Sequence, residues 1–226
     1  MDAAVVVTGG TGGLGAAVTQ VLLDAGWRVV VPYKDERELE RVATHERLTL
    51  VAADLFEPAA AATVIGHVSG RLDALVNLVG GYHSGGRVHE TPIDDFERQF
   101  RLNLRPTYLM CQAALPPMLE QGQGSIVCVS SRAALRPFAG ASGYIASKAA
   151  VLAFVDALAA EYTNDGIRAN AVLPSVIDTP AARAAKPDVD HSRWVKPEAI
   201  ARVIAFLCSE DSVPISGAHI PVYGRA

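Results

Sequence analysis

The chain alternates between short apolar runs and longer segments with a helical period. The short runs are rich in β-branched residues and carry apolar side chains at consecutive positions, which is typical of strands covered on both faces. The longer alanine- and leucine-rich segments between them predict helices. Regular alternation of this kind predicts a doubly wound α/β fold: a parallel sheet of about seven strands with helices on both faces. The predicted strands are AAVVVTG, WRVVVPY, LTLVAAD, LDALVNLVG, GSIVCVSS, IRANAVLP and AHIPVYG.

Two helix starts can be read from the local sequence. Thr91 precedes Pro92, and this order predicts a capping hydroxyl followed by proline in the first helical turn. Lys196-Pro197-Glu198 predicts the start of the last helix. The stretch 181–194 mixes alanine, arginine, proline and aspartate, and we expect an irregular lid there. No repeat or linker divides the chain, so residues 1–226 are predicted to form one domain.

Composition and charge restrict the function classes. The chain has 226 residues, half of them apolar and 19% charged, which excludes a disordered protein. The net charge is -4, and the basic residues are scattered rather than clustered. Nucleic acid is therefore not an expected partner, because no row of cations is present to neutralise phosphates.

The cysteines and the apolar runs bear on compartment and metal binding. Cys111, Cys128 and Cys208 lie far apart in apolar surroundings and are expected to be core thiols. The chain starts without a basic leader segment, and no apolar run approaches about 20 residues. We expect a cytoplasmic protein that does not cross a membrane. The histidines show no metal-ligand spacing, so no metal is expected.

A glycine-rich turn, TGGTGGLG, spans residues 8–15 between the first predicted strand and the following helix. Glycines allow the backbone to approach a phosphate closely, and a helix N-terminus presents free N–H groups. The alternative is a tight strand-to-helix turn without a ligand. The position between strand and helix favours a nucleotide site.

Tyr144 and Lys148 are four residues apart in the stretch GYIASK. On a helix they share one face, so the lysine ammonium can lower the pKa of the phenol and make it an acid or base near neutral pH. Taken alone, the spacing is more often found in an ordinary solvent-facing helix pair. Ser131 changes this balance, because it ends the strand SIVCVS, at the edge of a parallel sheet where ligands collect. Its hydroxyl can donate to a developing alkoxide.

The spacing TGxxxGxG, formed by Gly9, Gly13 and Gly15, resembles the coenzyme fingerprint of the short-chain dehydrogenase/reductase family. The resemblance continues in order along nearly the whole chain. It includes ADL at residues 53–55, NLVG at 77–80, Asn103, GSIVCVSS, YIASK and IRANAVLPSVIDTP. It implies one Rossmann-like NAD(P)-binding domain over residues 1–226.

The resemblance implies hydride transfer between a nicotinamide coenzyme and a carbonyl or alcohol. Tyr144 is expected to move the proton, and Ser131, selected over Ser130 by the family spacing, to polarise the substrate oxygen. Lys148 is expected to hold the nicotinamide ribose, and Asn103 to hold a water that relays protons. For Asn103, the alternative of a helix asparagine that satisfies a nearby backbone group stays open.

The resemblance also implies a set of coenzyme contacts. Tyr33 stands where NAD-specific members carry an acidic residue, and Lys34 follows it, so NADP(H) is favoured over NAD(H). The usual proline-glycine is Pro174-Ser175 here, a departure that is expected to shift the loop beneath the nicotinamide. The implied coenzyme residues are Thr8, Gly9, Thr11, Gly12, Gly13, Leu14, Gly15, Tyr33, Lys34, Asp54, Leu55, Asn77, Val79, Gly80, Tyr144, Lys148, Pro174, Ser175, Ile177 and Thr179.

The substrate is less well defined by the sequence. The region after Thr179 is short, and the segments around it resemble the dihydropteridine reductase branch, which implies a pterin-like or quinonoid substrate as an alternative. Ser131 fits a ketone or 3-oxoacyl reductase better. A dinucleotide sensor without turnover also stays open. By resemblance we expect a homodimer or homotetramer. Residues expected at the mouth of the site are Tyr82, His83, Arg87, Arg132, Phe138, Arg183 and Trp194.

Overall fold

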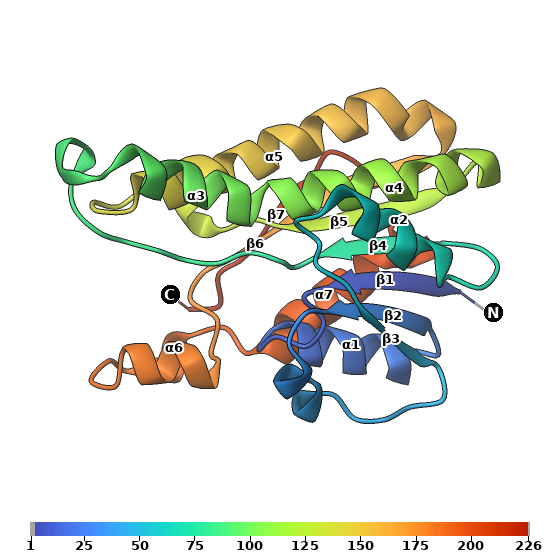
Figure 1. The fold of residues 1–226 in the computed structure, drawn as a ribbon, viewed down its shortest axis with the longest axis horizontal. Helices are drawn as coiled ribbons and strands as arrows, with labels where there is room; N and C mark the ends of the chain where they lie inside the picture. Colours follow the sequence, from blue (N-terminus) through green and yellow to red (C-terminus); the bar gives the residue numbers. More distant parts are fainter. Residues whose placement is uncertain (1–2, 226) are drawn as a thin grey trace.

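A computed structural model describes residues 3–225 and contains one parallel sheet of seven strands (Figure 1). The strand order is β3-β2-β1-β4-β5-β6-β7, and each neighbouring pair is parallel. All seven predicted strands are present, which confirms the doubly wound α/β fold. The strands are β1 (Ala4–Thr8), β2 (Arg28–Tyr33), β3 (Leu48–Ala52), β4 (Ala74–Asn77), β5 (Gly124–Val129), β6 (Ile167–Pro174) and β7 (His219–Val222).

Helices cover both faces of the sheet (Figure 1). On one face, α1 (Gly15–Asp24) packs against β1 and β2, and α7 (Pro197–Cys208) packs against β4, β5 and β6, with Val18 and Ile204 buried in this layer. On the other face lie α2 (Pro58–Gly66), α4 (Arg105–Gln121) and α5 (Ser142–Tyr162), with Met110 and Val155 in the core. The helix α3 (Ile93–Asn103) packs against α5. These two apolar layers explain why the central strands are apolar on both faces.

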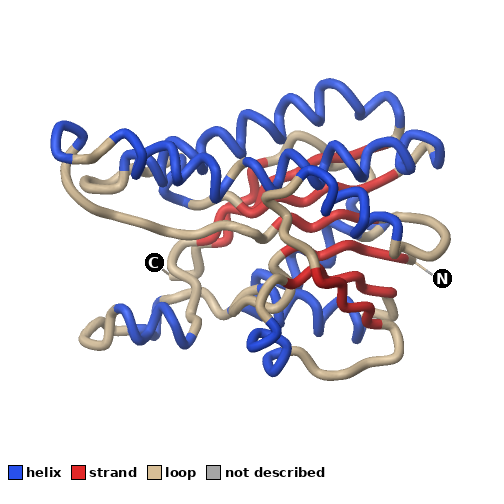
Figure 2. Tube along the Cα trace, in the orientation of Figure 1, coloured by secondary structure: helices blue, strands red, loops and turns tan. Residues whose placement is uncertain are grey.

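The chain reverses its winding direction between β1 and β4, which are neighbours in the sheet. Ligands of doubly wound folds collect at this point, beyond the carboxyl ends of the strands. Figure 2 shows the long connection that leaves β4 at this end and reaches the start of α3, and the loops on both sides of α6 (Pro180–Ala185). The glycine-rich turn and the Ser131 segment follow β1 and β5 at the same end.

Two local predictions differ from the structure. The Thr91 hydroxyl does not cap α3, because it donates to the carbonyls of Gly86 and Arg87 at 3.2 and 3.0 Å, and Pro92 is the N-cap residue. The stretch 181–194 is only partly irregular, since it contains most of α6 and the short 3-10 turn His191–Arg193. The predicted start of the last helix agrees with α7, which begins at Pro197.

The segment Ser142–Asp165 also differs from expectation, because it is long and apolar enough to span a membrane by length and composition. In this fold the segment is α5 and its following turn. Its residues Val151, Leu152 and Val155 are buried in the core against the sheet. A helix that packs on a parallel sheet is apolar for that reason, so its composition alone is weak support for a membrane span.

Candidate active site

The glycine-rich turn brings its backbone into close contact at the mouth of α1. Gly9 has φ +66°, and a Cβ atom on Gly15 would lie 1.9 Å from the Gly9 carbonyl oxygen. Only glycine fits at Gly15 for that reason. No side chain caps the start of α1, so its first N–H groups point to the turn without a side-chain acceptor. The turn therefore fits the diphosphate of a dinucleotide.

Other segments implied in coenzyme binding meet this turn. The Thr8 hydroxyl accepts hydrogen bonds from the N–H groups of Leu78 and Val79, at 3.1 and 3.5 Å. A Cβ atom on Gly13 would lie 2.9 Å from Cγ2 of Thr179, which places the loop after β6 over the turn. The structure thus brings the turn, the end of β4 and the Thr179 segment to one end of the sheet.

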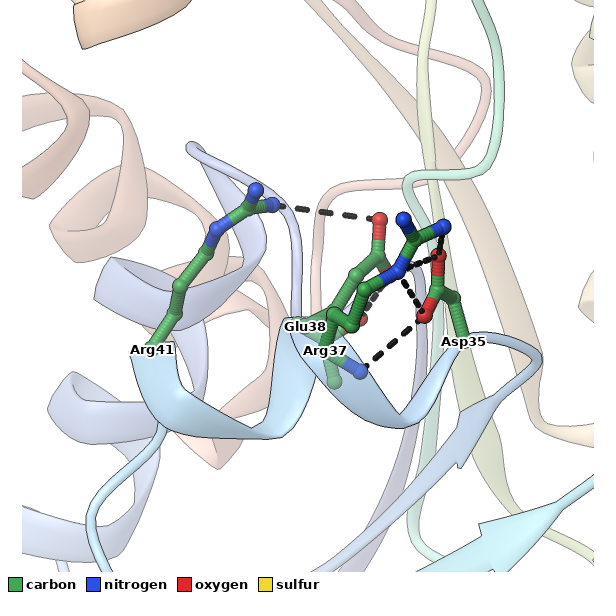
Figure 3. A network of polar contacts seen from close by, with 5 residues as sticks. Asp35, Arg37, Glu38 and Arg41 are labelled. Atoms are coloured by element: carbon green, nitrogen blue, oxygen red, sulfur yellow. Dashed lines mark hydrogen bonds and ion pairs between the residues drawn. The ribbon is translucent and has the colours of Figure 1, made fainter.

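The residues after β2 form a network of ion pairs (Figure 3). Lys34 Nζ lies 2.6 Å from Oδ2 of Asp54, and Arg37 Nε donates to Oδ1 of Asp35 at 2.9 Å. The Arg37 side-chain and backbone hydrogen bonds lower the pKa of Asp35 to about 2. The Thr11 hydroxyl donates to Oε2 of Glu38 at 2.6 Å, so this short helical turn, η1 (Glu36–Arg41), is tied to the glycine-rich turn.

Tyr144 lies in the first turn of α5, largely buried. Burial raises the pKa of its phenol, and a hydrogen bond with Ser131 acts in the opposite direction. The Tyr82 ring meets the Tyr144 ring edge to face, with centroids 5.0 Å apart. Ser131 therefore lies close enough to Tyr144 to affect its pKa, and the catalytic roles of both residues stay predictions.

Lys148 is buried one turn further along α5, with a side chain 6% exposed. Its ammonium donates to the Val129 carbonyl at 3.0 Å. Burial lowers the pKa of Lys148 to about 8, and the charge of the nearby Cys128 opposes this shift. We expected the ammonium to lower the pKa of Tyr144. In the described part of the chain it is bonded to the end of β5 instead.

Asn103 joins α3 to the end of β4 and to α5. Its Oδ1 accepts from the Gly81 N–H at 2.9 Å, and its Nδ2 donates to Ser147 Oγ at 3.0 Å. A Cβ atom on Gly80 would lie 2.6 Å from Asn103 Oδ1 and 3.1 Å from Lys148 Nζ. Asn103 therefore satisfies a backbone group, as one of the two readings of the sequence predicts. The proton-relay role stays a prediction.

The two serines that follow β5 have different surroundings. Ser130 is buried, and its hydroxyl donates to the Lys148 carbonyl at 2.7 Å, which fixes α5 to the end of β5. Ser131 is half-buried, and its Oγ accepts from the Ala133 N–H at 3.1 Å. Ser131 thus keeps its proton available for an oxygen placed beside Tyr144.

Asn77 is buried at the end of β4, against two thiols. Its Nδ2 lies 3.4 Å from Cys111 Sγ and 3.7 Å from Cys128 Sγ. All three cysteines are buried, and burial raises the pKa of Cys208 to about 12. The expectation of core thiols is confirmed. The Asn77 amide contacts one thiol on α4 and one on β5 and so links the end of β4 to both elements.

The segment after β6 has a structural reason for its departure from the family pattern. The Ser175 hydroxyl, in the place of the usual glycine, donates to the Tyr223 carbonyl at 2.8 Å. Ile177 forms an isolated parallel bridge with Val195. The loop below Thr179 is therefore tied to the end of the chain and to the segment before α7.

The residues predicted at the mouth fall into two groups. Tyr82 and Phe138 lie beside each other near Tyr144, with centroids 6.4 Å apart. Arg132 stacks over Tyr223. The other group is engaged elsewhere: Arg183 pairs with Asp178, and the Trp194 ring packs on His191.

Three residues near the site were not expected from the sequence: Glu38, Gln99 and Ser147. Ser147 and Gln99 carry a local signal, because Ser147 lies between Tyr144 and Lys148, and Gln99 precedes Asn103 by one helical turn. Glu38 carries no such signal in the sequence, because only the fold brings it next to Thr11.

Comparison with known proteins gives a consistent picture. A short chain dehydrogenase family model matches residues 3–190. The chain is 34% identical to 2-(R)-hydroxypropyl-CoM dehydrogenase of Xanthobacter autotrophicus, over 99% of this chain and 98% of that protein. The structure of ElxO with NADP bound has a TM-score of 0.92 and 26% identity, covering 99% of this chain and 98% of that one. A 3-ketoacyl-(acyl-carrier-protein) reductase from Brucella melitensis complexed with NADH has a TM-score of 0.89 and 29% identity, covering 99% and 97%.

Proposed function

The chain belongs to the short-chain dehydrogenase/reductase family, and on that basis we propose that Tyr144, Ser131 and Lys148 carry its reaction. The protein is an NAD(P)-dependent oxidoreductase of alcohols and carbonyl compounds. We assign it as a reductase of ketones or 3-oxoacyl compounds. The observation that carries the assignment is that Tyr144, whose pKa Ser131 lowers, lies one helical turn before the buried Lys148.

The side chains have two kinds of role in this proposal: proton transfer and stabilisation of the charge that develops on the substrate oxygen. When bound, a nicotinamide dinucleotide supplies hydride for reduction or accepts it for oxidation. Tyr144 donates its proton to the substrate oxygen during reduction, and burial keeps the phenol protonated in the free protein. Ser131 donates a hydrogen bond to the same oxygen and stabilises the charge that develops on it. Lys148 binds the ribose hydroxyls, and Asn103 holds the end of β4 in place.

Two alternatives are less well supported. A dihydropteridine-reductase-like activity fits the short region after Thr179, but it does not use a serine at the position of Ser131. A sensor without turnover does not require a serine beside the phenol, and Ser131 lowers the pKa of Tyr144 here. The ketone reductase is the assignment that uses both hydroxyl groups.

We propose that NADP(H) is preferred over NAD(H). The position of Tyr33 carries no carboxylate to repel a 2′-phosphate, and the Lys34 side chain is 68% exposed beside it. Lys34 is paired with Asp54, but an exposed ion pair contributes only about 0 to 1 kcal/mol, so a phosphate with about two negative charges can compete for the lysine. The relatives with NADP and with NADH leave the choice open.

Steady-state assays with a panel of ketones test the activity and the coenzyme together. We expect turnover with both reduced coenzymes and a kcat/KM about tenfold higher with NADPH. The Lys34→Ala variant is expected to lose most of that preference, whereas Lys186→Ala, at an exposed position after α6, should keep it. A strong preference for NADH would contradict the proposed coenzyme, and no turnover with either coenzyme would contradict the proposed activity.

We also propose that the protein forms a homodimer or homotetramer in the cytoplasm. The outer surface of α4 and α5 carries exposed apolar side chains, with Tyr108 and Leu119 about half exposed and small side chains exposed at Ala153 and Ala157. Small residues allow two helices to pack closely. Light scattering should give two or four times the chain mass, and Ala157→Arg should lower it. A monomeric mass at micromolar concentration would contradict this assembly.

A further inference from the structure

A hollow of about 170 Å³ lies where the starts of α3 and α5 meet the loop that follows β4. We refer to it as the α3/α5 hollow. Tyr144 lines it, so the residue that carries the proton also borders this space. The other lining residues used below are Glu90, Asp95, Gln99 and Ser142.

Gln99 is the residue that marks the hollow as a binding site. Its side chain is 3% exposed, and within residues 3–225 its Oε1 has no hydrogen-bond partner. Asn103, one turn later on the same helix face, has both ends of its amide bonded. Buried amide oxygens are nearly always paired, and leaving one unpaired is destabilising. Gln99 thus holds an acceptor ready for a donor that the fold itself does not provide.

The start of α5 adds donors to the same space. The helix begins at Ser142 after Ala141, and no side chain caps it, so its first N–H groups have no side-chain acceptor. The α3 helix likewise begins without a side-chain cap. The hollow therefore combines one buried acceptor with helix N–H donors, and a hydroxyl group can satisfy both at once.

Charge at the rim disfavours a carboxylate or phosphate as the bound group. Glu90 and Asp95 both line the hollow; Asp95 pairs with Arg98 at 2.8 Å, and the Glu90 carboxylate repels an anion. Among residues 3–225, no lysine or arginine lines it. A neutral hydroxyl meets no such penalty. A cavity of about 150 Å³ is known to admit a molecule the size of benzene, so the α3/α5 hollow has room for a short hydroxyalkyl group.

Resting on the proposed function, we propose that the α3/α5 hollow binds a second hydroxyl group of the substrate and that the protein acts on short hydroxy ketones and diols. Because both Tyr144 and Gln99 line the hollow, a substrate whose oxygen receives the proton of Tyr144 would place the hydroxyl of its neighbouring carbon toward Gln99. In the reduction of 3-hydroxybutan-2-one, the carbonyl carbon gains a hydride from the reduced coenzyme and its oxygen gains a proton from Tyr144. The product is butane-2,3-diol, and the hydroxyl in the hollow is unchanged.

The test compares 3-hydroxybutan-2-one with butan-2-one, which lacks the second hydroxyl. For the wild type, we expect kcat/KM to be at least about tenfold higher for the hydroxy ketone. Gln99→Leu, which removes the acceptor and keeps a similar volume, should lower this ratio by about tenfold. General damage to the site would instead lower both values together, so the ratio separates a specificity role from a structural one. Gln112→Leu, the same change at an exposed position on α4, is the matched control.

Thermal unfolding completes the test. Because Gln99→Leu removes an unpaired buried carbonyl, its melting temperature should be equal to or higher than that of the wild type. Gln99→Met serves as a second variant with the same expected loss of preference. An unchanged ratio in a folded variant, or equal wild-type kcat/KM for the two ketones, would overturn this inference and leave the proposed function intact. Inactivity of the wild type toward both would instead overturn the proposed function, and this inference with it.

Discussion

Replacing Tyr144 with phenylalanine should lower kcat for ketone reduction by about a thousandfold. General acid catalysis by a positioned side chain contributes about 10² to 10⁴ in rate, and the phenol is the acid that the site provides. Phenylalanine keeps the ring that Tyr82 meets edge to face and removes only the hydroxyl, whose pKa Ser131 lowers. The loss of absorbance of the reduced coenzyme gives kcat and KM for the variant and the wild type.

The same substitution at the far end of the helix supplies a control. Tyr162 closes α5, and Tyr162→Phe should leave kcat within about twofold of the wild type. Coenzyme binding measured by calorimetry should be retained in Tyr144→Phe. Undiminished turnover in that variant would remove Tyr144 from the mechanism, and it would leave Ser131 without the role proposed for it.

The protonation state of Tyr144 differs from what the sequence suggested. The spacing of Tyr144 and Lys148 predicted a phenol acidified by a neighbouring ammonium. In the structure, burial raises the pKa of the phenol, and the ammonium is bonded to the Val129 carbonyl. Burial thus favours the protonated phenol, which is the form that the proposed reduction would use. Alcohol oxidation needs the phenolate and should therefore be favoured by higher pH.

The fold was accessible from the sequence because the strands are covered on both faces. In β1, all five residues are buried, and a strand covered on both faces consists mainly of consecutive apolar residues. The glycine-rich turn was legible for a related reason, since no side chain fits at Gly15. In both cases the structural requirement, burial on two faces or space for no side chain, fixes the residue types in a short stretch and can be read from that stretch alone.

Other features depend on contacts between residues that are distant in sequence. Thr11 meets Glu38, which is 27 residues later, and Lys148 meets the Val129 carbonyl, which is 19 residues earlier. Their residue types do not predict these partners, because many acceptors are equally compatible with a threonine or a lysine. The predicted Thr91 cap was wrong for a similar reason. The Thr91 hydroxyl donates to carbonyls in the preceding loop, and these compete with the helix N–H groups for it.

Lys148→Met should stabilise the fold at neutral pH and abolish most of the activity. The pKa of Lys148 is about 8 in the folded protein, against 10.5 for an unperturbed lysine. Between these values the unfolded chain binds more protons than the folded one, so wild-type stability rises as pH rises through this window. Below pH 8 the buried ammonium destabilises the fold by about 3 kcal/mol. The stabilising effect of Lys148→Met on the free energy of unfolding should therefore shrink by about 2 to 3 kcal/mol between pH 7 and pH 10.

Denaturant unfolding at a series of pH values measures this difference, with Lys186→Met as the exposed control of the same chemistry. A stability difference that does not vary with pH would show that burial does not lower the pKa of Lys148. The comparison between two pH values isolates the effect of Lys148 protonation. The substitution also removes packing contacts and the hydrogen bond of the neutral amine, but these losses change the free energy of unfolding equally at both pH values. Residues that serve function are often retained although they destabilise the fold. A Lys148 that destabilises the fold and is needed for kcat would fit the proposed role in binding the ribose. A Lys148→Met variant that is both more stable at pH 7 and fully active would contradict that role.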